Sequence, residues 1–291
     1  MNPVISKEGV SLMLLSQLPR SPHDWAKALC SVPCWQLTPE ALLPAASAHD
    51  DAWLVLFGKA LDARDLAQVA RLLADHEVEA SLYPLGEQAG VPLLLLGANR
   101  FSPELVQAIK GQEWDIDVCH LAILPTLGEP GLLVMDMDST AIRIECIDEI
   151  ARLAGVGDQV AAVTAAAMQG KLEFADSLRS RVALLEGAPV TILDEVAAAM
   201  PWMPGLQLMV DTLKQSGWTV AIASGGFTRF AGELQQALGL DAIFANELAV
   251  EGGLLTGKVS GRIVDAAVKA EVLQQLARQH EIPVAQTVAV G

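Results

Sequence analysis

The stretch Leu132-Leu-Val-Met-Asp-Met-Asp-Ser-Thr140 places two carboxylates directly after a short apolar run. Such a run is typical of a buried strand, and an open α/β sheet binds its ligands at the carboxyl ends of its strands. Residues two apart in an extended segment point to the same side, so Asp136 and Asp138 can face one reacting centre and one hard cation together. The amides and hydroxyls of Ser139 and Thr140 suit a phosphoryl group. The alternative is that these residues simply cap a helix.

A second polar element, Ser224-Gly225-Gly226, ends the next expected parallel strand at 219–223. Its hydroxyl and unencumbered amides would meet the same crevice and form a second phosphate-binding element. Taken alone, these three residues could equally be a plain glycine turn. Lys269 lies beside Val272 and Leu273 on a predicted helix, so its ammonium emerges from the flank of the buried stripe and can reach a phosphate. The alternative is a surface lysine that covers apolar neighbours.

Strands alternate with helices through the whole second half of the chain. This alternation predicts an α/β fold with a doubly wound, mostly parallel sheet. The expected elements are strands at 132–135, 219–223, 242–245 and 287–290, a hairpin of 248–251 and 254–259 around Gly252-Gly253, a long helical region at about 147–200, and a helix at 265–280.

The first half shows two βαβ units with short connections and no polar cluster that looks catalytic. This pattern predicts an α+β, ferredoxin-like layer of helices on one sheet, which is a regulatory or pairing module more often than an active site. Residues up to about 50 are interpreted as irregular helical material. The expected elements are strands at 53–57, 78–82, 91–96 and 115–122 and helices at 63–76 and 102–110, the second capped by Ser102.

The loop Pro125-Thr-Leu-Gly-Glu-Pro-Gly131 is rich in Pro and Gly and separates the two patterns. We therefore expect one domain at 1–125 and a second at 126–291. The chain has 19 Lys and Arg against 35 Asp and Glu, a net charge of −16, which repels nucleic acid. Apolar runs stay well below the ~18 residues that span a bilayer, and no export signal begins the chain, so we expect a cytoplasmic protein and no membrane partner.

The order of strand with DxDST, strand with SGG, and helical lysine resembles the haloacid dehalogenase superfamily. The stretch 167–185 looks like the helical cap of bacterial phosphoserine phosphatases, and the resemblance covers 132–291. It implies a haloacid-dehalogenase-like domain with a cap insert at about 147–205. It also implies Mg²⁺-dependent hydrolysis of O-phospho-L-serine to L-serine and phosphate, the last step of serine biosynthesis.

The resemblance assigns roles to the matching residues. Asp136 would be the nucleophile that forms an aspartyl-phosphate, and Asp138 the general acid and later the base that activates water. Mg²⁺ would lie between the Asp136 carboxylate and the Asp138 backbone carbonyl. The loop 224–226, above all Ser224 and Gly225, would hold the phosphoryl oxygens, while Lys269 neutralises their charge.

Substrate choice would come from the cap. The resemblance assigns the substrate ammonium to Glu145 and the substrate carboxylate to Arg181, with Met168 and Phe174 closing over them. The sequence also supports Arg181 by its position on the inward flank of a helix, where an arginine needs an anionic partner. The alternative for Glu145 is an acid at a helix start that merely favours the helix dipole.

In the family, the strand that ends at Gly291 continues into a GDGxND loop that completes the magnesium site. We therefore expect a C-terminally truncated chain that is nearly inactive. The first half resembles, more weakly, ACT-like amino-acid-sensing modules, for which L-serine feedback and dimerisation are both open, with a homodimer expected. Two other functions compete with the phosphoserine phosphatase: a phosphatase or phosphotransferase of the same superfamily with another small substrate, and an amino-acid-binding regulator with a dead second half.

Overall fold

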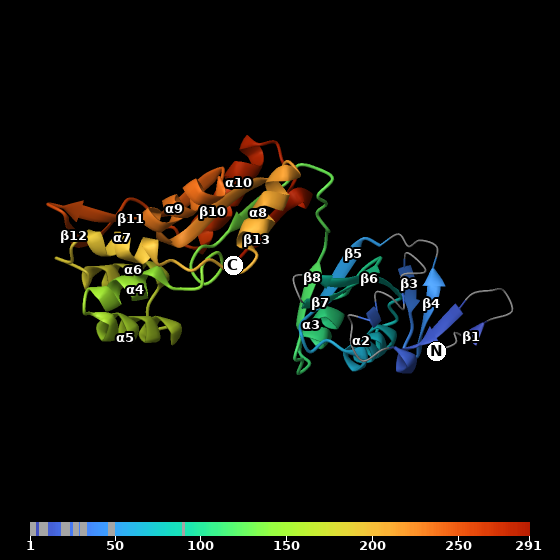
Figure 1. Ribbon diagram of the computed structural model, residues 1–291. Helices are drawn as coiled ribbons and strands as arrows, with labels where there is room; N and C mark the ends of the chain where they lie inside the picture. Colours follow the sequence, from blue (N-terminus) through green and yellow to red (C-terminus); the bar gives the residue numbers. More distant parts are fainter. Residues whose placement is uncertain are drawn as a thin grey trace. The chain divides into compact units, whose positions relative to one another are not determined.

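The computed structural model describes residues 4–5, 11–18, 24–25, 29, 34–45, 50–88 and 91–291. The chain divides into two compact units, Met1–Leu124 and Pro125–Gly291, each with its own sheet and hydrophobic core (Figure 1). The helices of the described residues include none that combines the length and the apolar character needed to cross a bilayer.

The second unit is built on a five-stranded sheet in the order β12-β11-β10-β9-β13. All neighbouring strands pair in parallel except β11 and β12, which form an antiparallel hairpin. The predicted doubly wound, mostly parallel sheet is therefore confirmed. The strands are β9 (Leu132–Met135), β10 (Thr219–Phe227), β11 (Ala242–Glu251), β12 (Leu254–Ser260) and β13 (Thr287–Val290).

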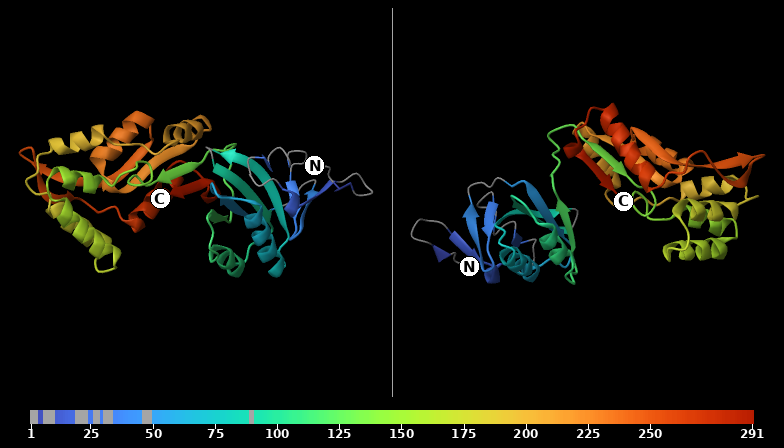
Figure 2. Two further views of the ribbon diagram at one scale, coloured as in Figure 1. Left: turned by 60° about the horizontal axis from the view of Figure 1, so that its bottom comes forward. Right: turned by 180° about the vertical axis from the view of Figure 1, so that it is seen from behind.

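Helices cover both faces of this sheet (Figure 2), because the strand side chains alternate between two cores. Leu132 and Val134 pack with α10 (Ala266–Gln279), whereas Leu133 and Met135 belong to the core on the other face. That second core includes α8 (Leu206–Gln215) and α9 (Thr228–Leu238). β9 is therefore buried on both sides, and its carboxyl end is held rigidly.

A helical insert follows β9. The sequence pattern predicted one long helical region there, and the structure divides it into four helices. Glycines with positive φ, among them Gly155 (74°) and Gly187 (79°), lie between the helices and allow the chain to turn where other residues would be strained. The helices are α4 (Cys146–Leu153), α5 (Gly157–Met168), α6 (Phe174–Ala183) and α7 (Thr191–Ala198).

The first unit holds an antiparallel sheet in the order β1-β2-β4-β3-β6-β7-β5-β8. The run β5-α2-β6-β7-α3-β8 has the strand order β6-β7-β5-β8 of a ferredoxin-like unit. Ser102 caps α3 as predicted, because its hydroxyl accepts the Leu105 N–H at 3.2 Å. These elements are β5 (Ala52–Phe57), α2 (Ala63–Asp75), β6 (Ala80–Gln88), β7 (Val91–Ala98), α3 (Pro103–Lys110) and β8 (Asp117–Leu121).

The expectation of irregular helical material before residue 50 is wrong for most of the described residues there. Four strands extend the ferredoxin-like sheet instead, and β3 pairs with β6. The many prolines suggested irregular structure, but Pro44 is accommodated within β4, where it lies opposite Trp35. The strands are β1 (Val4–Ile5), β2 (Ser11–Leu14), β3 (Cys34–Leu37) and β4 (Ala41–Ala45).

Candidate active site

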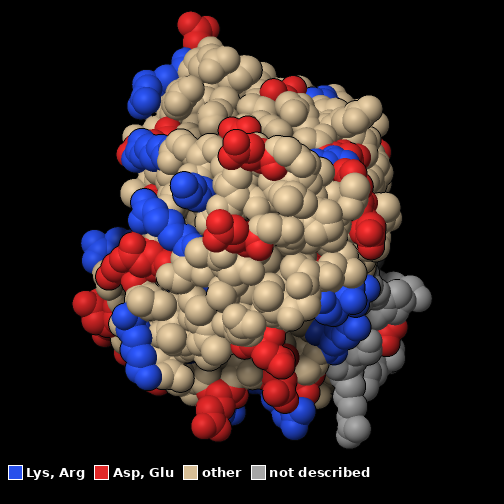
Figure 3. Space-filling view, turned by 90° about the vertical axis from the view of Figure 1, so that its left-hand side faces the viewer, with Lys and Arg blue, Asp and Glu red and all other residues tan. Residues whose placement is uncertain are grey.

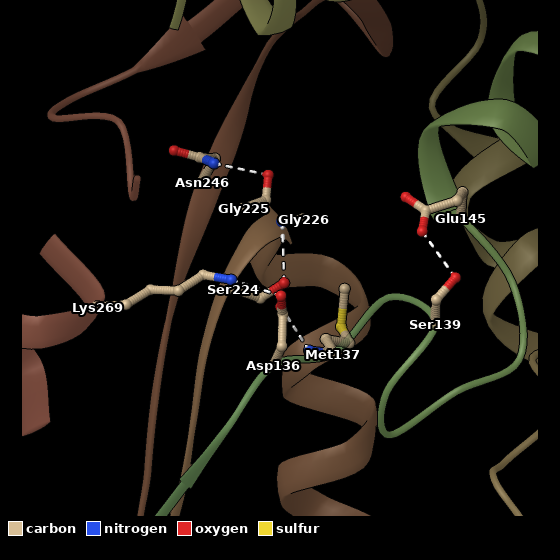
Figure 4. A network of polar contacts seen from close by, with 9 residues as sticks. All are labelled: Asp136, Met137, Ser139, Glu145, Ser224, Gly225, Gly226, Asn246 and Lys269. Carbon is tan, nitrogen blue, oxygen red and sulfur yellow. Dashed lines mark hydrogen bonds and ion pairs between the residues drawn. The ribbon is translucent and has the colours of Figure 1, made fainter. Parts of the chain in front are cut away.

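Asp136 is the first residue beyond β9 and is fixed through both its backbone and its side chain. Its N–H donates to the carbonyl of Val290 at 2.8 Å, and its Oδ1 accepts the Met137 N–H at 2.7 Å. Its Oδ2 pairs with the ammonium of Lys269, which reaches across from α10 (Figure 4). The structure thus joins the carboxylate and the lysine that the sequence placed 133 residues apart.

Asp138 lies in the turn after β9, with its Oδ1 3.4 Å from the N–H of Cys146. The pKa of the Asp138 carboxyl is raised to about 6, mainly by burial and to a smaller extent by the charges of Glu145 and Asp136, while hydrogen bonds from Cys146 act in the opposite direction. A carboxyl group with such a pKa can hold or release a proton near neutral pH. Its environment therefore differs from that of Asp136, which is neutralised by a lysine.

Glu145 occupies the N-cap position of α4, but its side chain caps no helix N–H. Its Oε1 instead accepts the hydroxyl hydrogen of Ser139 at 2.7 Å. Ser139 has a φ of 55°, an unusual conformation for a non-glycine residue, and such conformations cluster at functional sites. The Glu145 carboxylate is therefore held by Ser139 and not by the helix backbone, while its position at the start of α4 also suits the helix dipole.

The segment 224–226 lies within the last part of β10, which extends to Phe227 and not only to the predicted residue 223, and its two glycines lie close to neighbouring side chains. A Cβ on Gly225 would lie 2.6 Å from Cζ of Phe174, and one on Gly226 would lie 2.5 Å from the Met137 side chain and 2.8 Å from Oδ2 of Asp138. Ser224 is fully buried, and its Oγ accepts the Gly226 N–H at 3.0 Å. Bare backbone at Gly226 therefore lies beside Asp138.

These groups surround one cavity of about 330 Å³. Arg181 lines it from α6, and its Nε donates to the carbonyl of Ser177 at 3.4 Å. It forms no ion pair with any described residue, so the rest of its guanidinium is available to an anionic ligand. Met168, in contrast, is 85% exposed at the end of α5 and does not line the cavity. The lining residues are Asp136, Asp138, Glu145, Ile147, Phe174, Leu178, Arg181, Ser224, Gly225, Gly226, Phe227, Val264, Asp265, Ala266 and Lys269.

The carboxylates at the cavity floor fit a hard cation. No cluster of three or more His, Cys, Asp or Glu side chains that could hold a metal occurs among the described residues. Mg²⁺ needs fewer protein ligands than that, because it keeps several waters and accepts one or two carboxylates plus phosphate oxygens. Asp136 and Asp138 supply this donor type, and Glu145 and Asp136 place further negative charge near the Asp138 carboxyl, which a cation would offset.

The sequence analysis missed Asn246, a buried residue of β11 that hydrogen-bonds to the backbone of Gly225 and Val264. A single asparagine in a predicted strand carries no motif, so only the folded structure reveals its partners.

On the face drawn in Figure 3, acidic side chains are scattered among basic and uncharged ones, with no continuous basic surface. This view agrees with the net charge of −16. The cavity itself contains two cationic side chains, Arg181 and Lys269, beside the carboxylates of Asp136, Asp138, Glu145 and Asp265.

The model of the haloacid dehalogenase-like hydrolase family matches residues 133–291, more than half of the chain. The chain belongs to the haloacid dehalogenase-like hydrolase family. The match begins within β9 and contains every residue of the cavity, so the predicted resemblance is confirmed.

Curated relatives that resemble the chain include phosphoserine phosphatases. The enzyme of Vibrio cholerae is 52% identical over 177 residues, which are 61% of this chain and 54% of that protein. The enzyme of Idiomarina loihiensis is 55% identical over 161 residues, 55% of this chain and 73% of that protein. The matched stretch thus spans about half the length of the Vibrio cholerae and Haemophilus influenzae relatives.

Solved structures of the family support the fold. The unliganded crystal structure of a probable phosphoserine phosphatase from Vibrio cholerae has a TM-score of 0.61 and 41% identity, and covers 83% of this chain and 72% of that chain. A substrate-bound phosphoserine phosphatase complex has a TM-score of 0.53 and 40% identity, over 56% of this chain and 78% of that chain. The haloacid-dehalogenase-like fold predicted for the second half is confirmed.

Proposed function

We propose that the protein is a phosphoserine phosphatase that hydrolyses O-phospho-L-serine to L-serine and phosphate. The observation that carries this proposal is that a single cavity joins the pair Asp136 and Asp138 to the oppositely charged pair Glu145 and Arg181. A substrate with a phosphate, an ammonium and a carboxylate matches those three parts. The phosphoserine phosphatase relatives, which are 52% and 55% identical over the matched residues, support the same substrate.

In the proposed mechanism, Asp136 is the nucleophile. One carboxylate oxygen attacks phosphorus and forms an aspartyl-phosphate, while the bond from phosphorus to the serine oxygen breaks. The ion pair with Lys269 holds this carboxylate in place and offsets part of the charge that its approach to a phosphate brings together.

Asp138 is the proposed general acid and base. In its protonated form it gives its proton to the departing serine oxygen. As a carboxylate it then takes a proton from the water that attacks the aspartyl-phosphate and releases inorganic phosphate. The pKa of about 6 supports this role, because both protonation states are accessible near neutral pH.

The remaining residues would bind the substrate. Ser224 and the backbone of Gly225 and Gly226 hold the phosphoryl oxygens, together with Lys269. Glu145 meets the ammonium and Arg181 forms a bidentate pair with the carboxylate. Phe174, which already contacts the position above Gly225, closes the cavity over the substrate. Met168 stays a predicted closing residue, which would require movement of the cap.

Asp136 and Asp138 would also hold Mg²⁺. When bound, the ion would neutralise charge between the nucleophile and the phosphate.

A panel of phosphate esters tests the proposal. The protein that contains this chain is incubated with O-phospho-L-serine, O-phospho-L-threonine, glycerol phosphate and p-nitrophenyl phosphate, each with Mg²⁺ and with EDTA, and released phosphate is measured. We expect kcat/KM to be highest for O-phospho-L-serine and to vanish in EDTA. Faster turnover of another ester would instead favour a phosphatase with a different small substrate.

For the first unit we propose a regulatory or pairing role, with L-serine as ligand and a homodimer as assembly. Its ferredoxin-like strand order supports this, and β8 lies at the edge of the sheet. Titration calorimetry with L-serine and light scattering on the whole protein would separate the two roles. Heat of binding without a change in mass favours sensing, and a dimer without heat favours pairing.

A further inference from the structure

Asn246 connects two segments of the cavity wall. It lies on β11 and is 1% exposed. Its Nδ2 donates to the carbonyl of Gly225 at 2.8 Å (Figure 4), and its Oδ1 accepts the N–H of Val264 at 2.9 Å. Because one partner can only accept and the other can only donate, the orientation of the amide is determined. Both the donor and the acceptor of this buried amide are therefore hydrogen-bonded to residues that line the cavity.

The bond to Gly225 controls the direction of the neighbouring peptide. The pairing of β10 with β11 shifts register between Ala223 and Phe227, so the segment 224–226 leaves the regular ladder just before Phe227, which pairs with Asn246. A planar trans peptide points its C=O and its N–H in opposite directions. When Asn246 holds the carbonyl of Gly225, the N–H of Gly226 is directed to the other side, where it donates to Oγ of Ser224.

The bond from Val264 controls the beginning of α10. Asp265, the next residue, is the N-cap, and its side chain accepts the Val268 N–H at 2.9 Å. Its carbonyl accepts the backbone N–H of Lys269, also at 2.9 Å. The place of the Lys269 ammonium beside Asp136 therefore depends on where the first turn of α10 is anchored.

We infer that Asn246 is a positioning residue, which fixes the Ser224 hydroxyl and the Lys269 ammonium relative to each other so that both can bind one phosphoryl group. It does not line the cavity itself, so it acts through these two residues. This inference rests on the proposed phosphatase function. It adds that the machinery for the phosphoryl group, unlike Glu145 and Arg181, is controlled from β11.

Two properties follow for Asn246→Asp. The variant should lower kcat/KM by about ten- to hundredfold at pH 8, by the same factor for O-phospho-L-serine and p-nitrophenyl phosphate, because only the phosphoryl end is disturbed. The loss should also shrink relative to the parent protein as the pH falls to 5.5. A protonated carboxyl can donate to Gly225 and accept from Val264, whereas a carboxylate can only accept. Asn246→Ala should stay impaired at every pH.

Gln286→Glu is the matched control. Gln286 is also a buried amide, 4% exposed, and it hydrogen-bonds to the backbone of Thr126 and Glu129, but it does not line the cavity. Its variant should lower the melting temperature and keep kcat/KM within about twofold, since a carboxylate loses the two hydrogen bonds that Gln286 donates away from the cavity. A kinetic loss in Asn246→Asp without rescue at low pH, or no greater than in Gln286→Glu, would overturn the positioning role.

The comparison remains decisive if O-phospho-L-serine is not the substrate. The same variants are then compared on p-nitrophenyl phosphate. The activity of the parent protein on the two esters tests the substrate proposal, and the ratio of variant to parent activity tests the positioning role. Affinity for orthovanadate, measured by titration calorimetry, gives a readout that needs no turnover. We expect weaker binding by about tenfold in Asn246→Asp and unchanged binding in Gln286→Glu. Equal affinities would contradict the inference.

Discussion

Ser139 donates its hydroxyl hydrogen to Oε1 of Glu145 at 2.7 Å, from a backbone with a φ of 55°. The bond fixes a carboxylate that would otherwise rotate freely at the start of α4. A strained residue therefore sets the direction of the group proposed to bind the substrate ammonium.

Ser139→Ala is expected to raise KM for O-phospho-L-serine by about three- to tenfold, the loss of one hydrogen bond to a charged group. The turnover of p-nitrophenyl phosphate, which has no ammonium, should change by less than twofold. Steady-state kinetics with both esters checks this. An equal loss on both would assign Ser139 to the phosphoryl end of the cavity instead.

Arg181→Gln is expected to lower kcat/KM for O-phospho-L-serine by about a hundredfold, because a charge-assisted, bidentate contact is lost. Activity on p-nitrophenyl phosphate should persist. Arg179→Gln is the matched control, since Arg179 lies on the same helix, is 63% exposed and pairs with Asp176. Comparable losses in the two variants would show that general charge, and not the cavity position, decides the effect.

Gly226→Ala is expected to lower kcat by about ten- to hundredfold. The new methyl group would lie 2.8 Å from Oδ2 of Asp138 and would displace a proposed general acid. Gly232→Ala in α9 is the control, because nothing lies within 4 Å of its Cβ position. That variant should keep full activity and gain about 0.5–1 kcal/mol of stability, from the higher helix propensity of alanine.

Asp138→Asn is expected to stabilise the metal-free protein while it abolishes turnover. The folded-state pKa of about 6 lies above the ordinary value of 3.8, so the folded protein binds this proton more tightly than the unfolded chain does. The protonated carboxyl therefore contributes stability that is fully present below pH 3.8. This contribution decreases as the pH rises and is lost above about pH 6. We expect a gain of about 1–3 kcal/mol at neutral pH.

Urea unfolding in EDTA at about pH 7.5 and pH 4.5 measures this gain. The difference between Asp138→Asn and the parent should shrink to about a third at the lower pH, since the parent carboxyl is then mostly protonated in the folded state. A gain that is independent of pH would show that it arises from packing and not from charge.

Much of the second unit could be predicted from its sequence. The strand 132–135 and its two aspartates follow from a local apolar run and from the rule that ligands bind at strand ends. The hairpin around Gly252-Gly253 was also predicted, but 242–245 and 248–251 proved to be one strand, β11. Local patterns mark where a strand is apolar, whereas its length depends on partners that are distant in the sequence.

The first fifty residues and Asn246 could not be predicted for related reasons. β3 pairs with β4 and with β6, and these distant partners stabilise the strands. The prolines around them therefore led to a wrong prediction of irregular structure. The partners of Asn246 lie 21 and 18 positions away, and no spacing in the sequence connects them. Met168, on the exposed end of α5, stays a prediction that only a ligand-bound state can test.

The aspartyl-phosphate on Asp136 is tested most directly by acid quenching the protein during turnover of ³²P-labelled O-phospho-L-serine. We expect a transient, acid-stable label on the peptide that contains Asp136, and neither label nor turnover in Asp136→Asn. Label on another residue, or undiminished phosphate release by Asp136→Asn, would contradict the proposed mechanism.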